Sequence, residues 1–325
     1  MNISLNNDLI NNIYYNFNIR KKENEFDTYT AVNDTRTQAI INNPSDYEIA
    51  VARFSLPTYS LPVFIWKGNE YFQLVYTYGI TKIFKYVKFS PSISNNNIYG
   101  DCIWTYQQFI DLINKALKEA FTDLKTAEPL CPATEPAFLY YNAKTRLLVW
   151  NTEQAYGTTT KVYFNQELFF LMPSFSAFGT TINNILFWEM KSKDNKNNHA
   201  IINGINYFST KQEYPTVYLW KNFKTIIFQT DNIPVNSEYT MSQQNDFRRV
   251  LTDFEVVQGD LDEKQVIQYY PRAEMRWYDL MSSQQLRKMD IKVYWGDNTG
   301  KIYPLFLDTD NFIFTMKLYL RKKIK

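Results

Sequence analysis

The sequence predicts a mainly β fold of the sandwich or jelly-roll class. Many short runs of strand-forming residues are separated by turn-forming residues, which is the pattern of these folds. Only one long stretch, 105–124, repeats its apolar residues at the three- and four-residue spacing of a helix. Aromatic side chains make up 17% of the 325 residues, and such side chains suit half-buried sheets and the cores of interfaces. The chain shows no sustained alternation of strands and helices, which disfavours a doubly wound sheet.

The first predicted strands follow a polar, Asn-rich arm. A short strand is expected at 13–19. Two strand-like runs then flank the turn at 42–46, where Pro44 fixes its own φ and the Asn and Asp side chains can bond the local backbone. Further on, Pro57 and Pro62 cannot donate to a ladder, so the segment between them is expected at a sheet edge, a bend or a contact surface.

The strand after this turn, 47–54, is not purely polar on either face. Alternation places Tyr47, Ile49, Val51 and Arg53 on one face and Glu48, Ala50, Ala52 and Phe54 on the other. We therefore expect this strand to be covered on both sides or to lie in an interface.

The same part of the chain carries a family resemblance. The order DTRTQ at 34–38, NPSDY at 43–47, ARFSLP at 52–57 and LPVFIW at 61–66 resembles the N-terminal part of the minor capsid (penton) proteins of virophages and related polinton-like double-stranded DNA viruses. Residues 251–320 resemble the closing part of those proteins, and together the two stretches cover roughly a third of the chain.

The resemblance implies a vertical single jelly roll that forms pentamers at the vertices of an icosahedral virion assembled in the host cytoplasm. Because the resembling stretches lie toward opposite ends of the chain, we expect a jelly-roll base domain made of 1–75 and 216–325. The residues 76–215 would form an inserted, partly helical, β-rich upper domain. An uninterrupted N-terminal jelly roll followed by a separate C-terminal β-domain fits the strand pattern equally well.

The predicted upper domain contains a hairpin and the long helix. Runs 71–78 and 80–89 alternate as strands and are separated by Gly79. Thr105 and Gln108 have the spacing of a capping box, in which the hydroxyl accepts from the N–H three residues on and the Gln side chain reaches back. The apolar stripe that follows is expected to pack on a sheet; it consists of Phe109, Leu112, Ile113, Ala116, Leu117, Ala120, Phe121 and Leu124.

A short helix and further strands complete the prediction. The helix is expected at 166–172, capped by Asn165 and ended by Pro173. The polar run 191–198 is expected to be a surface loop or linker. Strands are expected at 137–141, 146–151, 161–164, 181–191, 215–220, 224–229, 248–258, 290–295, 301–307 and 312–320, and 290–295 pairs with 301–307 as a hairpin.

The sequence favours a structural protein over an enzyme and predicts no catalytic, cofactor or metal site. His199 is the single histidine and lies beside a polar loop without a nucleophile motif. Cys102 and Cys131 have no metal-ligand spacing and are expected to be reduced. The acidic runs at 260–263 and 308–310 lack the EF-hand pattern and are interpreted as solvated turns. No secretory signal or membrane span is expected.

The expected partners are further copies of the chain, as a homopentamer, and the surrounding major capsid protein. We expect part of the subunit interface at Arg36, Arg53, Tyr59, Phe64 and Trp66. The basic clusters at 20–22 and 321–325 could touch packaged DNA or simply aid solubility, and the net charge of +2 is too balanced for a dedicated nucleic-acid binder.

Two other functions stay open at this point. The first is a virion-surface β-sandwich that attaches to carbohydrate or protein through exposed Tyr and Trp side chains. The second is an enzyme that acts through paired carboxylates, since such pairing is spatial and cannot be read from sequence spacing.

Overall fold

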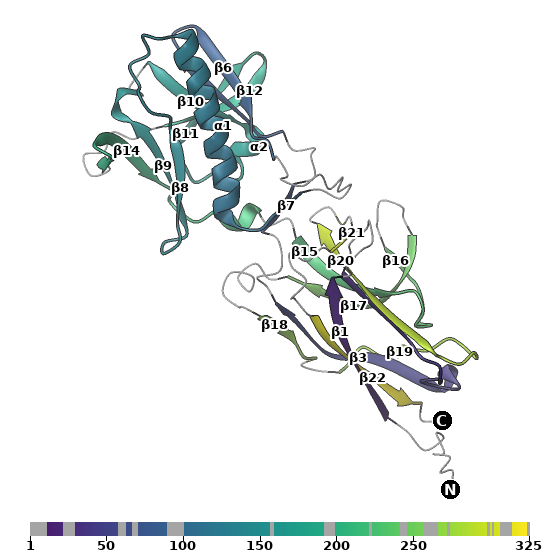
Figure 1. Cartoon of the computed structure of the whole chain (residues 1–325). Helices are drawn as coiled ribbons and strands as arrows, with labels where there is room; N and C mark the ends of the chain where they lie inside the picture. The colour runs from purple at the N-terminus through teal and green to yellow at the C-terminus, as the bar shows by residue number, and fades with distance from the viewer. Residues whose placement is uncertain are drawn as a thin grey trace. The chain divides into compact units, whose positions relative to one another are not determined.

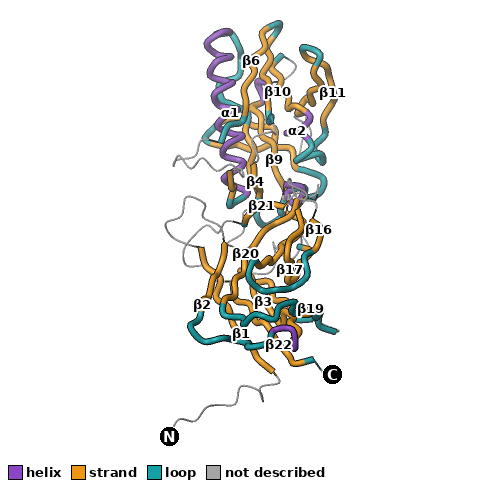
Figure 2. The backbone as a smooth tube through the Cα atoms, turned by 90° about the vertical axis from the view of Figure 1, so that its right-hand side faces the viewer, coloured by secondary structure: helices purple, strands orange, loops and turns teal. Residues whose placement is uncertain are grey.

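The chain folds into two compact units. The computed structural model describes residues 12–21, 30–57, 63–66, 71–89, 101–156, 159–191, 199–220, 223–240, 246–256, 266–271, 274–297, 300, 302–305 and 314–323. The first unit joins Met1–Leu61 to Asn222–Lys325, and the second is the continuous stretch Pro62–Lys221. We refer to them as the jelly-roll domain and the insertion domain. Strands dominate both, and α1 is the one long helix of the described residues (Figures 1 and 2).

The jelly-roll domain contains two groups of antiparallel strands. The first sheet has the order β1 (Asn12–Lys21), β22 (Phe314–Lys322), β3 (Tyr47–Pro57) and β18 (Val266–Tyr269), with β19 (Tyr278–Asp279) also on β3. The second has the order β2 (Thr30–Thr35), β20 (Lys288–Asp297), β15 (Phe223–Thr230), β17 (Asp246–Glu255) and β16 (Glu238–Thr240), with β21 (Ile302–Pro304) also on β20. A 3₁₀ turn at Pro44–Asp46 leads into β3.

These orders confirm the predicted jelly roll. We number the eight main strands 1 to 8 along the chain, in the order β1, β2, β3, β15, β17, β18, β20 and β22. One sheet then has the order 1-8-3-6 and the other 2-7-4-5, which is the strand order of a jelly roll. β1 and β2 meet only at Arg20↔Ala31 and Lys21↔Thr30, where one sheet turns into the other. Between the sheets, Phe54 of β3 packs on Phe228 of β15 with ring centroids 4.9 Å apart.

Strand β3 contains a β-bulge that changes which side chains are buried. Arg53 pairs with Lys317, but the next pair is Val51 with Leu318, so Ala52 is an extra residue. The predicted alternation therefore holds up to Val51 and is wrong after it. Phe54, which that alternation placed opposite Val51, is buried, and Arg53 is exposed.

The insertion domain is built from three sheets. The largest has the order β11 (Ala177–Ile182), β12 (Ile185–Met190), β10 (Thr160–Asn165), β5 (Gln73–Tyr78) and β6 (Thr81–Tyr86). The second has the order β13 (His199–Ile202), β14 (Ile205–Lys211), β9 (Leu147–Glu153) and β8 (Phe138–Asn142). The third pairs β4 (Phe64–Trp66) with β7 (Asp101–Ile103), and 3₁₀ turns lie at Gln154–Tyr156 and Val217–Trp220.

Helix α1 (Tyr106–Ala127) begins at the predicted cap. The Thr105 hydroxyl accepts from the Gln108 N–H at 3.1 Å, while the Gln108 side chain accepts from the N–H of Trp104, one residue before the position that a capping box uses. The apolar stripe is buried against β5, β6 and β8 except for the half-buried Leu112. The short helix α2 (Gln166–Phe169) is capped by Asn165, as predicted, although it ends earlier than expected.

Two predicted strands have other structures. Residues 181–191 contain the end of β11, a turn and β12, because Asn183 and Asn184 both adopt positive φ, which Asn tolerates better than most residues. Within 215–220 the structure has the 3₁₀ turn Val217–Trp220. The predicted hairpin of β5 and β6, the pair β20 and β21, and the final strand β22 are all present.

The structure divides the chain at 61/62 and 221/222, whereas the sequence placed the divisions at 75/76 and 215/216. The strand β5 spans the first predicted boundary and pairs with both β6 and β10. Trp220 lies beyond the second predicted boundary and is buried in the insertion-domain core.

Candidate assembly surfaces

The outer face of the first jelly-roll sheet combines aromatic and basic side chains. Tyr14 of β1 and Tyr319 of β22 stack with ring centroids 4.6 Å apart. The Lys317 ammonium lies 4.3 Å from the centre of the Tyr14 ring, and the Arg321 guanidinium lies 3.8 Å from that of Trp277. Such cation–π contacts hold the basic groups in place and leave them able to meet an external anion.

Arg53 belongs to this outer face. It lies directly opposite Lys317 in the β3–β22 ladder, and its side chain is exposed. Neither residue forms an ion pair with any other described residue. Arg321 differs, because its guanidinium pairs with Glu48 of β3. The face therefore presents two neighbouring positive charges that the described part of the jelly-roll domain does not neutralise.

Arg36 lies just beyond the end of β2, beside an open groove. The groove has a volume of about 990 Å³ and is lined by residues 12–16 and 35–40. The Arg36 Nε donates to the Tyr15 hydroxyl at 3.0 Å and to Asp34 at 3.3 Å, while the Tyr15 hydroxyl donates to Asp34. The Arg36 side chain is 56% exposed, so this ion pair adds little stability but fixes the guanidinium at the rim of the groove.

Of the other predicted interface residues, the structure places Phe64 and Trp66 in the insertion domain. Trp66 is buried in its core, with its ring centroid 5.1 Å from that of Phe72 and 6.4 Å from that of Phe109. This packing leaves little Trp66 surface for another subunit. The Phe64 backbone pairs with Ile103 in the β4–β7 ladder, but its side chain, like all of Tyr59, lies outside the described residues.

Some titratable side chains of the described regions hold loops and strands of the insertion domain in place. No three His, Cys, Asp or Glu residues gather there as metal ligands would. His199 bonds to Gln154 at 2.6 Å and packs on Phe208. The buried Glu153 accepts from the N–H groups of Thr134 and Glu135 at 2.6 and 3.0 Å, which anchors a loop. The acidic runs 260–263 and 308–310 lie outside the described residues.

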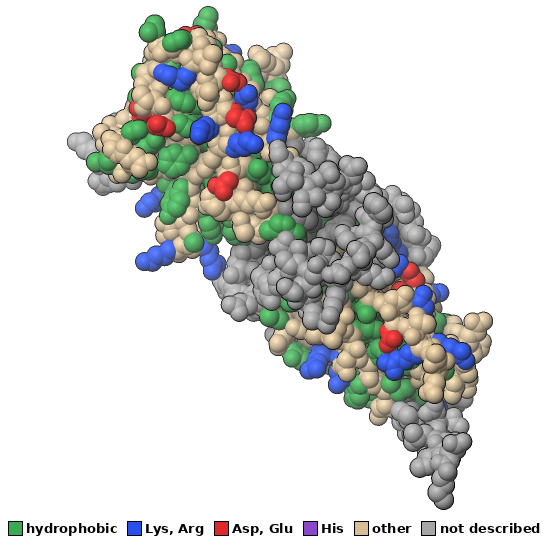
Figure 3. Space-filling view, viewed as in Figure 1, with side chains coloured by type: hydrophobic (Ala, Val, Ile, Leu, Met, Phe, Trp, Pro, Cys, Tyr) green, Lys and Arg blue, Asp and Glu red, His purple; other side chains and the backbone are tan. Residues whose placement is uncertain are grey.

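The insertion domain exposes several aromatic side chains. Tyr71, Phe170 and Phe178 are more than half exposed, and the Lys191 ammonium lies 3.5 Å from the centre of the Phe178 ring. On the side shown in Figure 3, hydrophobic, basic and acidic side chains are intermingled over the described surface. No helix of the described regions is long and apolar enough to cross a membrane.

The sequence prediction missed most of the aromatic and basic face. Lys317, Tyr319 and Arg321 alternate with buried residues along β22, so the two-residue period of a strand could have predicted that they share one face of the sheet. The stacking of Tyr319 on Tyr14 was not readable, because it depends on the pairing of the strands at the two ends of the domain.

The family model of the Sputnik minor capsid protein V18/19 matches residues 13–322 of this chain. The chain belongs to this family. Among curated relatives, the uncharacterized protein V18 of the Sputnik virophage is 28% identical over 139 residues, which cover 34% of this chain and 83% of V18. The structural protein V19 of the same virophage is 29% identical over 124 residues, which cover 36% of this chain and 56% of V19.

Two solved structures share the architecture of this V18/19 family member. A chain in the cryo-EM structure of the Sputnik virophage aligns with a TM-score of 0.73 and 25% identity, covering 96% of this chain and 98% of that one. The mavirus penton protein aligns with a TM-score of 0.68 and 14% identity, covering 96% and 99%. The predicted family resemblance is thus confirmed, and the V18/19 family member is a structural protein of the virion capsid.

Proposed function

We propose that the chain forms the penton, a homopentamer at the fivefold vertices of an icosahedral capsid that is assembled in the host cytoplasm. The observation that carries this proposal is the alignment with the mavirus penton protein, which extends over 96% of the chain and includes both the jelly roll and the insertion. In this proposal the jelly-roll domain forms the base of the capsomer, and the insertion domain forms its upper part.

A closed ring of five copies needs two different, complementary patches on each subunit. Arg53 and Lys317 supply one patch of unneutralised charge, and Arg36 supplies a fixed guanidinium at the groove rim. We assign these residues to contacts with acidic groups of a neighbouring copy or of the major capsid protein. Tyr59 and Phe64 are proposed to add apolar contact area to the subunit interface.

Packaged DNA is a further proposed contact of the basic residues near the two ends of the chain. The exposed Lys322 continues the basic series of β22. Phosphate contacts of this kind do not depend on sequence and weaken steeply as salt concentration rises. DNA retention by the purified chain should therefore fall with added salt and be the same for unrelated DNA sequences.

Light scattering of the purified chain across concentration and salt tests the pentamer. A discrete five-subunit species is expected, and Arg53→Glu should shift it toward the monomer. Lys144→Glu, in an exposed turn of the insertion domain, is the matched charge-reversal control and should leave the mass unchanged. A discrete species of another size, such as a trimer, would contradict the proposal.

The exposed aromatic side chains favour a second candidate function for the insertion domain. In this function Tyr71, Phe170 and Phe178 stack on a sugar or a protein ligand as an attachment surface. A glycan array with the wild-type chain and a Phe178→Ser variant tests this function. Glycan binding that is equal in the wild-type chain and in Phe178→Ser would show that the exposed Phe178 ring does not support an attachment function.

A further inference from the structure

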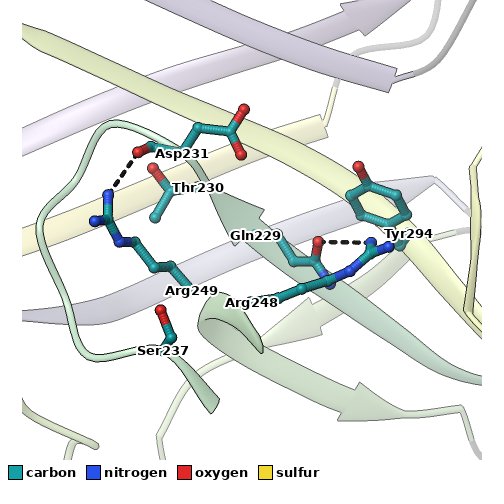
Figure 4. A pocket seen from close by; sticks show the side chains of 7 residues that line it. All are labelled: Gln229, Thr230, Asp231, Ser237, Arg248, Arg249 and Tyr294. Atoms are coloured by element: carbon teal, nitrogen blue, oxygen red, sulfur yellow. Dashed lines mark hydrogen bonds between the residues drawn. The ribbon is translucent and has the colours of Figure 1, made fainter. Parts of the chain in front are cut away.

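A polar recess lies on the second jelly-roll sheet, apart from the residues discussed so far. It has a volume of about 460 Å³ and is lined by Gln229, Thr230, Asp231, Ser237, Arg248, Arg249 and Tyr294. Figure 4 shows these side chains, which come from β15, β17 and β20 and from the loop 231–237 between β15 and β16. The strands are neighbours in the sheet, so a rigid ladder sets the spacing of the donors.

The two arginines of the recess have no acidic partner among the described residues. Arg248 Nη1 donates to the Gln229 Oε1 at 3.2 Å, and its guanidinium lies 5.2 Å from the centre of the Tyr294 ring. Arg249 Nη1 donates to the backbone carbonyl of Asp231 at 2.6 Å. Each guanidinium has five N–H groups, so both retain donors for a ligand.

The one carboxylate of the lining is already neutralised. The Lys292 ammonium pairs with the Asp231 carboxylate. The positive charges of Arg248 and Arg249 are therefore not balanced by the lining itself, which makes the recess electropositive.

Gln229 gives the second, independent indication of a ligand. Its side chain is 4% exposed, and its Nε2 has no hydrogen-bond partner. The orientation of the amide is fixed, because an arginine only donates and therefore selects the oxygen. A buried donor without an acceptor destabilises the protein. Because this Nε2 is closed off from solvent, an oxyanion in the recess would supply that acceptor once a neighbouring side chain shifts.

The turn that forms one wall of the recess is rigid. The buried Asp290 accepts from the Thr230 hydroxyl at 2.8 Å and from the N–H groups of Asp231 and Asn232 at 3.0 and 2.8 Å. The Thr230 hydroxyl in turn accepts from the Ile233 N–H at 3.0 Å. This network holds Asp231 and Thr230 in place, so this wall of the recess is formed before any ligand enters.

We propose that the recess is an oxyanion-binding site, and that in the capsid its ligand is a carboxylate side chain of a neighbouring chain. The second part rests on the proposed penton function. Guanidinium and amide donors match the planar geometry of a carboxylate. The chain itself contains 33 Asp and Glu residues, so a second copy can provide the acidic group.

Thermal unfolding of the full chain with sodium acetate, compared with sodium chloride at equal ionic strength and pH, tests the site. Acetate is expected to raise the Tm of the wild-type chain above the chloride value. Arg248→Gln should weaken acetate binding about tenfold or more, since it removes a charge-assisted hydrogen bond. Arg287→Gln, an exposed arginine of the same domain, is the control and should retain the response.

Gln229→Glu is a second variant, and it leaves both arginines of the recess in place. The new carboxylate should pair with Arg248, raise the Tm without added anion and abolish the acetate response. Equal acetate responses in the wild-type chain, Arg248→Gln and Gln229→Glu would overturn the site. A larger response to inorganic phosphate than to acetate would overturn the carboxylate as its ligand.

Light scattering separates this proposal from the penton function. If a neighbouring carboxylate fills the recess, Arg248→Gln should raise the concentration needed for the five-subunit species about tenfold. If Arg248→Gln loses the acetate response but assembles as the wild-type chain does, the carboxylate does not come from a neighbouring subunit. A wild-type chain that responds to acetate but forms no pentamer would contradict the penton function and leave the oxyanion site standing.

Discussion

Arg53 lies directly opposite Lys317 across the β3–β22 ladder, and the bulge at Ala52 is what brings Arg53 to the outer face. Two like charges at directly opposite positions of a sheet destabilise it. The arrangement is tolerable for a surface that meets acidic groups of another chain.

Lys317→Glu should therefore separate the stability of the jelly-roll domain from assembly. The substitution replaces the repulsion between Arg53 and Lys317 by an attraction, which should exceed the lost Lys317–Tyr14 cation–π contact and raise the free energy of unfolding by about 0.5 kcal/mol. It should also weaken the pentamer, because the outer face loses its positive charge. Urea denaturation and light scattering measure the two effects, and a variant that gains stability without losing assembly would exclude this face from the interface.

Asp290→Asn should loosen the turn behind the oxyanion recess. Burial alone would raise the pKa of Asp290, but hydrogen bonds from Asp231, Thr230 and Asn232 outweigh it and lower this pKa below its ordinary value. We expect a loss of about 2 kcal/mol at pH 7, measured by urea denaturation. The exposed Asp253→Asn is the control and should change little.

The same lowered pKa fixes the direction of the pH dependence. A carboxyl group with a lower pKa in the folded state stabilises the fold above its unfolded pKa, and that contribution disappears as the pH falls through the folded pKa. The stability difference between the wild-type chain and Asp290→Asn should therefore be constant near neutral pH and shrink below about pH 4. A difference that grows on acidification would contradict this account.

Tyr76→Phe should destabilise the insertion domain through a buried backbone group. The Tyr76 hydroxyl accepts from the Ala137 N–H at 2.9 Å and lies 3.2 Å from the Tyr156 hydroxyl, and burial raises the pKa of Tyr76 well above its ordinary value. Removing the hydroxyl leaves the Ala137 N–H unpaired, at a cost of about 1–3 kcal/mol. Tyr140→Phe, at a largely exposed position, should be neutral in the same denaturation experiment.

Thr105→Ala should fray the start of α1. The hydroxyl caps the Gln108 N–H, and loss of such a cap costs about 1 kcal/mol. Thr122→Ala is the matched control, because that hydroxyl bonds the Lys118 carbonyl inside the same helix and caps nothing. Equal losses of helical circular dichroism in the two variants on heating would show that the cap contributes nothing special.

Local patterns predicted the parts of this fold that local physics decides. The cap and apolar stripe of α1, the Asn165 cap of α2 and the β5–β6 hairpin all depend on residues close in sequence. The bulge in β3 is different, because an extra residue appears only when the strand is aligned with Lys317 and Leu318, which are far away in the chain.

The candidate surfaces were predictable only in part for the same reason. Arg36 and Arg53 were selected from a stretch with a family resemblance, and both are exposed in the structure. Trp66 was selected with them, but its burial depends on contacts with Phe72 and Phe109 across the insertion-domain core. The oxyanion recess joins Gln229, Arg248 and Tyr294, and no sequence pattern indicates that these three residues meet.

The pairing of β1 with β22 also governs the order of events during synthesis. Residues from Asn12 to Ile19 find their ladder partners in Phe314 to Arg321, so the first sheet stays incomplete until those residues have been translated. The insertion domain is one continuous stretch, Pro62–Lys221, and all its strands leave the ribosome earlier. We therefore expect nascent chains to hold a folded insertion domain and a still open jelly roll, which delays assembly until β22 is made.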